Sequence, residues 1–512
     1  MMRPWNLNID DYRNKVLGCW AGKNIGGTLG TPVEGQRKTH DVKFYIHNIN
    51  GDPLPNDDLD IQLIWLKAVE EQGIGHITPR LLGEYWINYV IGPWNEYGVG
   101  ACNIRNGFIP PISGSLNNER WHASNGAWIR AEVWASMFPG SPAMAAHYAW
   151  MDACIDHCGD GIFAEIFTAA LESAAYVETD LRKLINIALA HIPANSRVAR
   201  AVKLVCDCYD KKIDYRETRE LVMKDSADLG WFQAPANVAF AIIGLLYSEG
   251  DFEKAVCYAV NCGDDTDCTG GLAGAVMGIM MGADKIPEKW IEPIGHGIKT
   301  VAVNPISLFL PETIEELTDR VIQAAIQNTV HFIDLPGITN EPTSISEETK
   351  ANLGVLSEET RIDLWERRSN EITFDLPYAK LAVIYEDGAA VRTGDTFKLT
   401  FHLSSLPYSN QLLHGTFVLP EGWTSSAPGF MLRQVCGDTT IAITAGAFTK
   451  NIMYIPLELQ LTGRMAPVRV YIPIQFAEGA RLDCRALEIR PEDNIFATHD
   501  WRKVRHEILV NK

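Results

Sequence analysis

The sequence has no long apolar run and no excess of positive charge. Its longest apolar stretch, residues 272–281, falls well short of the roughly 20 residues that cross a bilayer, so we expect no transmembrane helix. The formal net charge of −19 argues against partners that are nucleic acids or anionic membrane surfaces. We therefore expect a small-molecule or glycosyl-conjugate partner, and the sequence leaves the oligomeric state open.

The sequence also lacks a paired cysteine motif and an apolar leader. Its 11 cysteines are scattered, and the one close pair, Cys206 and Cys208, has no second pair to complete a zinc site. The first residues, MMRPWNLNIDDYRNK, carry acids where a signal peptide has an apolar segment. We therefore expect a cytoplasmic protein with reduced, mostly buried thiols.

Two kinds of periodicity divide the 512 residues. Residues 1–335 consist of apolar segments broken by Gly, Pro and Asn, such as ANVAFAIIGLLYSEG at 236–250, and predict an all-α domain. Residues 336–359 are rich in Pro, Thr, Ser and Glu, which is typical of a linker. From 360 to 512 apolar residues alternate, as in VRVYIPIQF and TFKLTFHL, which predicts a β-sandwich that folds as a separate unit.

Acidic residues gather before two predicted helices. NDDLD, residues 56–60, precedes IQLIWLKAVEE, and CGDDTDCTGG, residues 262–271, continues into LAGAVMGIMMGA. Acids at a helix N-terminus are favoured by its exposed N–H groups and dipole, so the first cluster alone is typical of a capped helix. The second cluster holds three carboxylates within four residues, more than a cap needs, and a cation would hold them together. Ligands that are all oxygen favour Mg²⁺ or Mn²⁺ over zinc.

Glycines recur at every fourth position in the helix predicted after the second acidic cluster. Each glycine destabilises a helix by roughly 1 kcal/mol relative to alanine, so close approach of another helix should compensate. This pattern predicts a helix deep in a bundle, with its acidic N-terminus facing a cleft. The stripe comprises Gly270, Gly274, Gly278 and Gly282.

These two motifs, together with GCWAGKNIGGTLGTPVEG near the N-terminus, resemble the ADP-ribosylglycohydrolase family, which includes dinitrogenase reductase-activating glycohydrolase. The resemblance runs from about residue 12 to about residue 290. It implies an all-α fold and a binuclear Mg²⁺ or Mn²⁺ centre. In that family the ligands come from a Thr-Asp-Asp triplet early in the chain and a Gly-Asp-Thr-Asp-Thr segment late in it.

The resemblance also implies roles for individual residues. Glu34 resembles the glutamate that activates water or contacts the scissile ribose, and Asp58 and Asp265 join it as candidate catalytic residues. The metal ligands it implies, for one or two ions, are Asn56, Asp57, Asp58, Asp265, Asp267 and Cys268.

The sequence departs from the family pattern at three positions. Asn56 and Cys268 stand where threonine is common, and Gly27 stands where many members have aspartate. Asn56 still offers a carbonyl oxygen, but a thiol is a poor Mg²⁺ ligand, so one metal position could be weakened. Asp60 and Asp264 are additional acids, which could be ligands, supporting residues or surface residues.

Three further stretches supply candidate substrate-binding residues. SNGAWIRAE (124–132) is similar to the family's Asn-Gly-x-x-x-Arg segment, and DHCGDGIFAEIF (156–167) resembles a stretch that carries a His near an acid. IGPWNEYG (91–98) offers side chains that could stack on a sugar or base. A capped helix, a structural histidine and core aromatics are equally consistent with these patterns. The candidates are Trp94, Asn125, Gly126, Arg130, His157 and Asp160, with Asn95, Tyr97 and Asp156 beside them.

The expected activity is metal-dependent hydrolysis of a glycosidic bond in an ADP-ribosyl or other glycosyl or ribosyl conjugate. One alternative is a non-catalytic protein that keeps the fold and has lost a metal position through Asn56 and Cys268. Another is a carbohydrate-binding protein in which the β-sandwich is the active part. Because the sandwich shows no clustered acids and no nucleophile motif, we expect it to pack on the α-domain, to form one wall of the cleft or to mediate oligomers.

Overall fold

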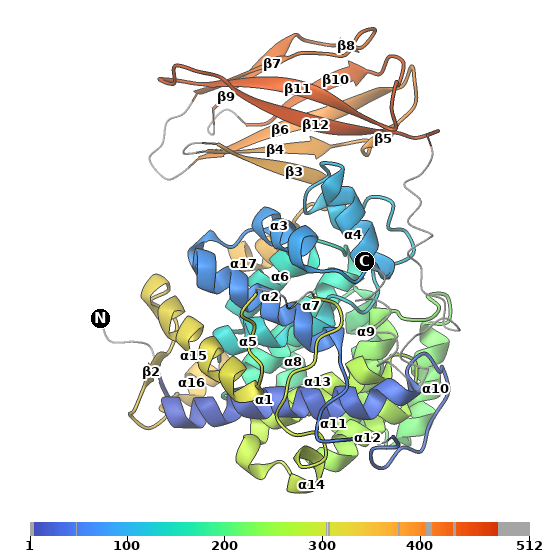
Figure 1. The fold of residues 1–512 in the computed structure, drawn as a ribbon, viewed down its shortest axis with the longest axis vertical. Coiled ribbons are helices and arrows are strands. Elements are labelled where there is room, and N and C mark those ends of the chain that lie inside the picture. Colours follow the sequence, from blue (N-terminus) through green and yellow to red (C-terminus); the bar gives the residue numbers. More distant parts are fainter. Residues whose placement is uncertain are drawn as a thin grey trace.

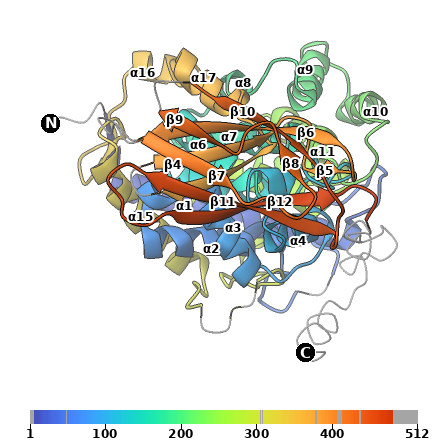
Figure 2. The ribbon, with the colours of Figure 1, turned by 90° about the horizontal axis from the view of Figure 1, so that it is seen from above.

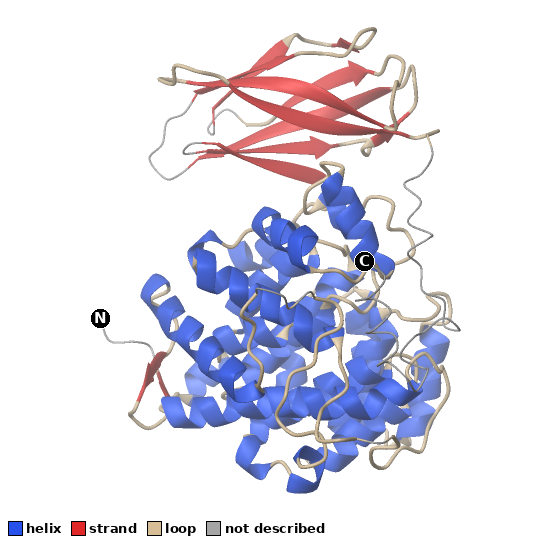
Figure 3. Ribbon diagram, viewed as in Figure 1, coloured by secondary structure: helices blue, strands red, loops and turns tan. Residues whose placement is uncertain are grey.

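The computed structural model describes residues 5–47, 49–303, 305, 308–376, 379–405, 412–433 and 437–479. A helical domain carries a β-sandwich at one end of its long axis (Figure 1). Figure 3 shows how cleanly helices and strands separate between the two parts. The predicted fold class, an all-α domain followed by an all-β domain, is confirmed. None of the described helices combines the length and apolar character that a membrane span requires.

The helical domain contains helices of very different length. The short 3-10 helices are η1 (Thr31–Val33), η2 (Ile74–His76), η3 (Ile112–Gly114), η4 (Trp128–Arg130) and η5 (Ala283–Lys285). The α-helices are α1 (Ile9–Gly30), α2 (Asp57–Gln72), α3 (Pro79–Tyr89), α4 (Asn95–Arg105), α5 (Glu132–Met137), α6 (Pro142–Ala153), α7 (Asp160–Ala175), α8 (Leu181–Ala190), α9 (Arg197–Asp210), α10 (Tyr215–Asp225), α11 (Ala234–Tyr247), α12 (Phe252–Asn261), α13 (Thr266–Met281), α14 (Glu288–Ile291), α15 (Ile314–His331), α16 (Glu347–Ala351) and α17 (Glu358–Trp365).

Helices α1 and α13 pack backbone against backbone in the middle of the helical domain. A Cβ atom added at Gly22 would lie 1.9 Å from the carbonyl oxygen of Gly274, so no side chain fits between the two helices. The predicted close approach to the glycine stripe of α13 is therefore confirmed, and the partner is a second glycine stripe on α1. The helices run antiparallel, so the end of α1 meets the start of α13. The facing glycines are Gly18, Gly22, Gly26 and Gly30 on α1 and Gly270, Gly274 and Gly278 on α13.

The sandwich consists of two five-stranded sheets, in which all neighbours except β5 and β12 pair antiparallel. Alternate residues of β11 are buried, as the period of two predicts, whereas β12 buries the four consecutive residues 472–475. The first sheet has the order β3 (Glu371–Leu376), β4 (Ala379–Tyr385), β6 (Thr396–Ser405), β10 (Thr439–Thr444), β8 (Thr424–Ser425). The second has the order β5 (Ala390–Val391), β12 (Val468–Phe476), β11 (Ile452–Leu461), β7 (Leu412–Phe417), β9 (Gly429–Arg433).

The segment predicted as a linker, residues 336–359, contacts the helical domain. Its strand β2 (Gly337–Thr339) pairs in parallel with β1 (Asn6–Asn8), and Leu353 lies in the helical core. Helix α17 follows, and the sandwich begins with β3 at Glu371. The part of the predicted sandwich from 480 to 512 lies outside the described residues. The exact domain boundaries stay predictions.

The two domains share side chains where they meet. Phe108 and Ile112 follow α4 in the helical domain but belong to the hydrophobic core of the sandwich. The hydroxyl of Tyr454 donates to the carbonyl oxygen of Asn106 at 3.1 Å. Figure 2, seen from above, shows the strands lying across the helical domain. The sandwich thus packs against the segment that follows α4 in the helical domain.

Candidate metal centre and pocket

A pocket lies where the end of α1 meets the starts of α2 and α13. The antiparallel glycine contact between α1 and α13 sets this meeting point, because it places η1, with Glu34 after it, beside the N-terminus of α13. Every described residue that lines the pocket belongs to the helical domain. The predicted catalytic and metal-binding residues among them are Glu34, Asp57, Asp58, Asp265, Asp267 and Cys268.

Backbone hydrogen bonds fix Glu34 next to the second acidic cluster. The N–H of Gly35 donates to the carbonyl oxygen of Asp264 at 2.8 Å, and the N–H of Asp264 donates to that of Gln36 at 3.1 Å. The carboxylate of Asp264 forms an ion pair with Arg37 at 2.9 Å. Asp264 is therefore engaged in joining the two loops, and its carboxylate is not among the groups that line the pocket.

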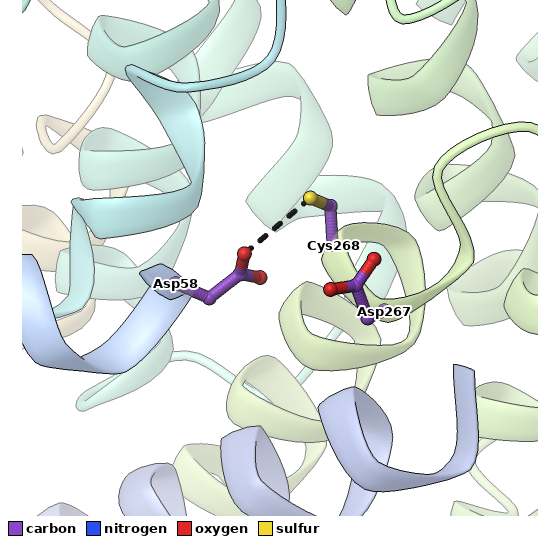
Figure 4. Close-up of side chains that lie close together, drawn as sticks. All are labelled: Asp58, Asp267 and Cys268. Carbon is purple, nitrogen blue, oxygen red and sulfur yellow. Dashed lines mark hydrogen bonds between the residues drawn. The ribbon is translucent and has the colours of Figure 1, made fainter. Parts of the chain in front are cut away.

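The ligand-type atoms of the pocket form two groups that share Asp267. The carboxylates of Asp58 and Asp267 and the thiol of Cys268 place their atoms within 4.8 Å of one another (Figure 4). The carboxylates of Glu34, Asp265 and Asp267 meet the same limit. One oxygen each of Asp265 and Asp267 is buried without a hydrogen-bond partner among the described residues. These buried oxygens fit a divalent cation, which would satisfy them.

The raised pKa values of the pocket acids also indicate that the site lacks sufficient positive charge. Burial raises the pKa of Asp58 to about 7, and the Asp57 carboxylate adds to the rise while Lys23 opposes it. Burial, and then the Glu34 carboxylate, raises the pKa of Asp265 well above its usual range. So many carboxylates cannot all be ionised in one buried pocket unless a cation offsets their charge.

Lys23 is a buried cation behind the pocket that the motif analysis did not select. Its ammonium lies 2.7 Å from a Glu132 oxygen and 3.3 Å from an Asp58 oxygen. Burial alone would lower the pKa of Lys23, but Glu132 and Asp58 raise it above its usual value. The available signal was a lysine inside the small and apolar run GCWAGKNIGG. Lys23 thus holds Asp58 and offsets part of its charge.

Two of the three residues that depart from the family pattern, Gly27 and Asn56, lie next to each other. Asn56 caps α2, because its amide oxygen accepts the Asp58 N–H at 2.7 Å, and its amide nitrogen donates to Asp267 at 3.3 Å. A Cβ atom at Gly27 would lie 2.7 Å from that nitrogen. The amide of Asn56 therefore occupies space that a side chain at position 27 would need. Asn56 orients Asp267 in this geometry, and its role as a metal ligand stays a prediction.

Asp57 and Asp60 have different surroundings although both lie in the first turn of α2. Asp57 lines the pocket and accepts a hydrogen bond from the Tyr97 hydroxyl at 2.9 Å. Asp60 is fully buried and accepts the N–H groups of Val301 and Ala302 at 2.5 and 2.7 Å. Asp60 therefore ties a distant loop to α2, whereas Asp57 is available to the pocket.

Aromatic side chains form a second part of the pocket wall, beside the acids. The prediction included Trp94 and Tyr97, which line the pocket with Asn95. It missed Trp231 and Phe232, whose rings stack at 4.7 Å between centroids in the loop between α10 and α11. The signal in the sequence was an aromatic pair directly after Gly230, in a segment with no helical period. Such a wall suits the face of a sugar or a base.

Asn125 and Gly126 connect the acidic side of the pocket with a further acid, Glu96. The amide of Asn125 donates to Asp265 at 2.6 Å, and the N–H of Gly126 donates to Glu96 at 3.1 Å. A Cβ atom at position 126 would lie 2.2 Å from the Glu96 carboxylate, so a larger residue there would displace that carboxylate. Glu96 lines the pocket, and burial, followed by Asp156, raises its pKa to about 8.

Arg130, His157 and Asp160, also predicted to bind substrate, are not among the described residues that line the pocket. Arg130 is fully buried and pairs with Asp152 and Asp156 at 2.8 Å each. His157 is buried against the same Asp156, also at 2.8 Å. Asp160 accepts the N–H of Val198 and joins α7 to α9. Their contact with substrate stays a prediction, and the geometry gives them supporting positions.

The fold and the pocket together define a protein whose all-α domain holds a buried, acidic site suited to divalent cations. Against this background, the family model for ADP-ribosylglycohydrolase matches residues 8–330. The chain belongs to the ADP-ribosylglycohydrolase family, which supports hydrolysis of a glycosidic bond as its general activity. A comparison with curated proteins finds no match.

Proposed function

We propose that the protein is a metal-dependent glycosidase that hydrolyses an ADP-ribosyl conjugate or another glycosyl or ribosyl conjugate. The observation that carries the proposal is the pair of ligand groups that share Asp267 in one pocket with Glu34. Mg²⁺ or Mn²⁺, one or two ions, fits the carboxylate oxygens of Glu34, Asp58, Asp265 and Asp267. When bound, such an ion supplies Lewis acidity that offsets negative charge and polarises oxygen atoms of the substrate.

Glu34 is the residue that we expect to take the proton from the attacking water. It sits at the point where the α1 and α13 backbones meet, so its position does not depend on a flexible connection. Asp57 is oriented by Tyr97, and Asp265 is oriented by Asn125. Fixed carboxylates on one side of the anomeric carbon stabilise the positive charge that develops in an oxocarbenium-like transition state.

The aromatic wall is the part of the pocket that we expect to bind the organic part of the substrate. Trp94, Trp231 and Phe232 offer ring faces for a sugar or a base. The substrate can be an ADP-ribosylated Arg or Ser side chain, a free ADP-ribose conjugate, a nucleoside or a carbohydrate glycoside, and the leaving group is then the side chain, the conjugated group, the base or the aglycone. We expect a substrate with a flat or sugar-like face next to the scissile bond.

Hydrolysis assays on the full-length protein test the proposal. Metal-free protein is incubated with Mg²⁺ or Mn²⁺ and with ADP-ribosyl-arginine, an ADP-ribosyl-serine peptide, inosine and nitrophenyl glycosides, and product release is measured by chromatography. We expect hydrolysis of at least one substrate, which chelation by EDTA abolishes. The proposal is wrong if the metal-loaded protein hydrolyses none of them.

The variant Glu34→Gln separates catalysis from binding. An amide cannot take a proton from water, so we expect turnover to fall by about 10²-fold or more. Metal binding, measured by calorimetry, should weaken but persist, because the glutamine amide oxygen and the carboxylates of Asp265 and Asp267 can still hold the ion. Glu119→Gln is the matched control, because Glu119 is exposed and outside the pocket lining. Equal turnover of Glu34→Gln and wild type would remove Glu34 from the mechanism.

A further inference from the structure

The two ligand groups that share Asp267 differ in chemistry. The group of Glu34, Asp265 and Asp267 offers only carboxylate oxygens, whereas the group of Asp58, Asp267 and Cys268 includes a sulfur. In Figure 4 the three side chains of the second group point toward one another from α2 and α13. The protein therefore holds two unequal positions for a cation within one pocket.

Cys268 differs from the ordinary buried cysteines of this chain. Its thiol lies 3.4 Å from an Asp58 carboxylate oxygen, and the residue lines the pocket while only 3% exposed. By contrast, the Cys262 thiol donates to the carbonyl oxygen of Tyr258 in the preceding turn, away from the pocket. This thiol donates to a carboxylate, and a bound cation can displace its proton so that the sulfur becomes a ligand.

A second observation at the same place points to a cation. One oxygen of Asp267 is buried and has no hydrogen-bond partner among the described residues, although the side chain faces Asp58 and Cys268. Lys23 also contacts Asp58 at 3.3 Å and offsets part of the negative charge of the group. A hard ion bound mainly by charge gains less at such a position, while an ion that bonds to sulfur gains from the thiol.

We propose that the group of Asp58, Asp267 and Cys268 binds a thiophilic divalent transition-metal ion, such as Co²⁺, Zn²⁺ or Fe²⁺, through the sulfur of Cys268. The group of Glu34, Asp265 and Asp267 is the position for a hard ion, Mg²⁺ or Mn²⁺. This inference rests on the proposed function, because it assigns different ions to the two halves of the same centre.

Cobalt spectroscopy tests the sulfur ligand without any substrate. The metal-free full-length protein is titrated with Co²⁺, and we expect a near-ultraviolet charge-transfer band from a thiolate bonded to cobalt. Cys268→Thr, which restores the hydroxyl residue common in the family, should lose this band. Cys262→Ser removes another buried thiol and should keep it. Cys268→Ser serves as a second variant of similar volume in case the threonine protein does not fold.

Calorimetry then measures the selectivity that the sulfur confers. We expect the ratio of Mg²⁺ to Zn²⁺ dissociation constants to fall at least tenfold in Cys268→Thr and to stay constant in Cys262→Ser. Co²⁺ binding by wild type without the band, or an unchanged ratio in Cys268→Thr, overturns this inference and leaves the proposed function intact. No binding of any of these ions by wild type overturns both.

Discussion

The helical domain and the described part of the sandwich differ in the charged side chains that they bury. In the helical domain, buried acids, Lys23 and Arg130 surround the pocket, whereas in the described part of the sandwich the buried polar side chains are those of Thr400 and Gln475. Burying a charge destabilises a fold unless partners compensate, so charges persist inside only where paired or used. From this difference we propose that the chemistry belongs to the helical domain and that the sandwich has a packing role.

The two domains also build their cores differently. The centre of the helical domain depends on backbone contact between α1 and α13, which only glycine allows. The sandwich depends on alternating side chains of its own strands, and Phe108 and Ile112 of the helical domain complete its core. The segment after α4 is therefore part of the sandwich core. Helix α4 itself begins with Asn95, which lines the pocket.

The largest effect that this comparison predicts is at Gly22. In Gly22→Ala the new Cβ atom would lie 1.9 Å from a backbone oxygen of α13, which cannot move away as a side chain can. We expect a loss of at least about 3 kcal/mol in the free energy of unfolding, together with weaker metal binding. Denaturant unfolding and calorimetry measure both.

Gly75→Ala is the matched control for Gly22→Ala. The nearest atom to a Cβ at Gly75 would be 3.7 Å away, and the residue is exposed. We expect its free energy of unfolding to stay within about 1 kcal/mol of wild type. If the two variants are equally stable, the helical domain does not depend on the glycine contact, and the contrast between the two cores fails.

An intermediate effect is expected at Phe108. Phe108→Ala removes a fully buried ring from the sandwich core and should lower the stability of the sandwich by about 3 to 5 kcal/mol. Metal binding should persist, because the pocket lining does not include Phe108. Phe309→Ala is the control, since Phe309 is 86% exposed. Simultaneous loss of sandwich structure and metal binding would contradict the separation of roles.

The smallest effect is a change in pH dependence at Glu96. Its pKa is raised to about 8, so the folded protein keeps a proton that the unfolded chain releases from about pH 4.5 upward. The contribution of Glu96 to stability therefore falls as the pH rises from about 4.5 to about 8. Glu96→Gln should remove this fall, so its stability should depend less on pH than that of wild type over this range.

Denaturant midpoints of wild type and Glu96→Gln between pH 5 and pH 9 measure this contribution. Glu119→Gln provides the baseline for an exposed glutamate. Parallel curves for wild type and Glu96→Gln would show that the buried carboxyl does not carry the proton in the folded state. The titratable and charged groups that face Glu96 and would share such a response are Asp156, Arg130 and His157, whose Nε2 atom lies 3.8 Å from the Glu96 carboxylate.

Several features of the fold and site follow from local sequence. Period-two strands, helical segments and the glycine spacing of α13 are local patterns, and the structure confirms the two fold classes and the close helix contact. The match between the acidic motifs and a family predicted the residues that meet in the pocket, including Asp58 and Asp267. Local spacing also predicted helix starts at both acidic clusters, which α2 and α13 have.

Only the tertiary structure decided what faces the pocket. Lys23, Glu96 and Trp231 lie at or behind it because helices and loops distant in sequence pack together, and no local period encodes that meeting. Arg130 and His157 share a motif-like spacing with pocket residues, yet packing turns them toward Asp156. The sequence by itself determined which segments are helices, which are strands and where acids concentrate. The direction of each side chain, and hence its partner, depends on long-range contacts that local sequence does not fix.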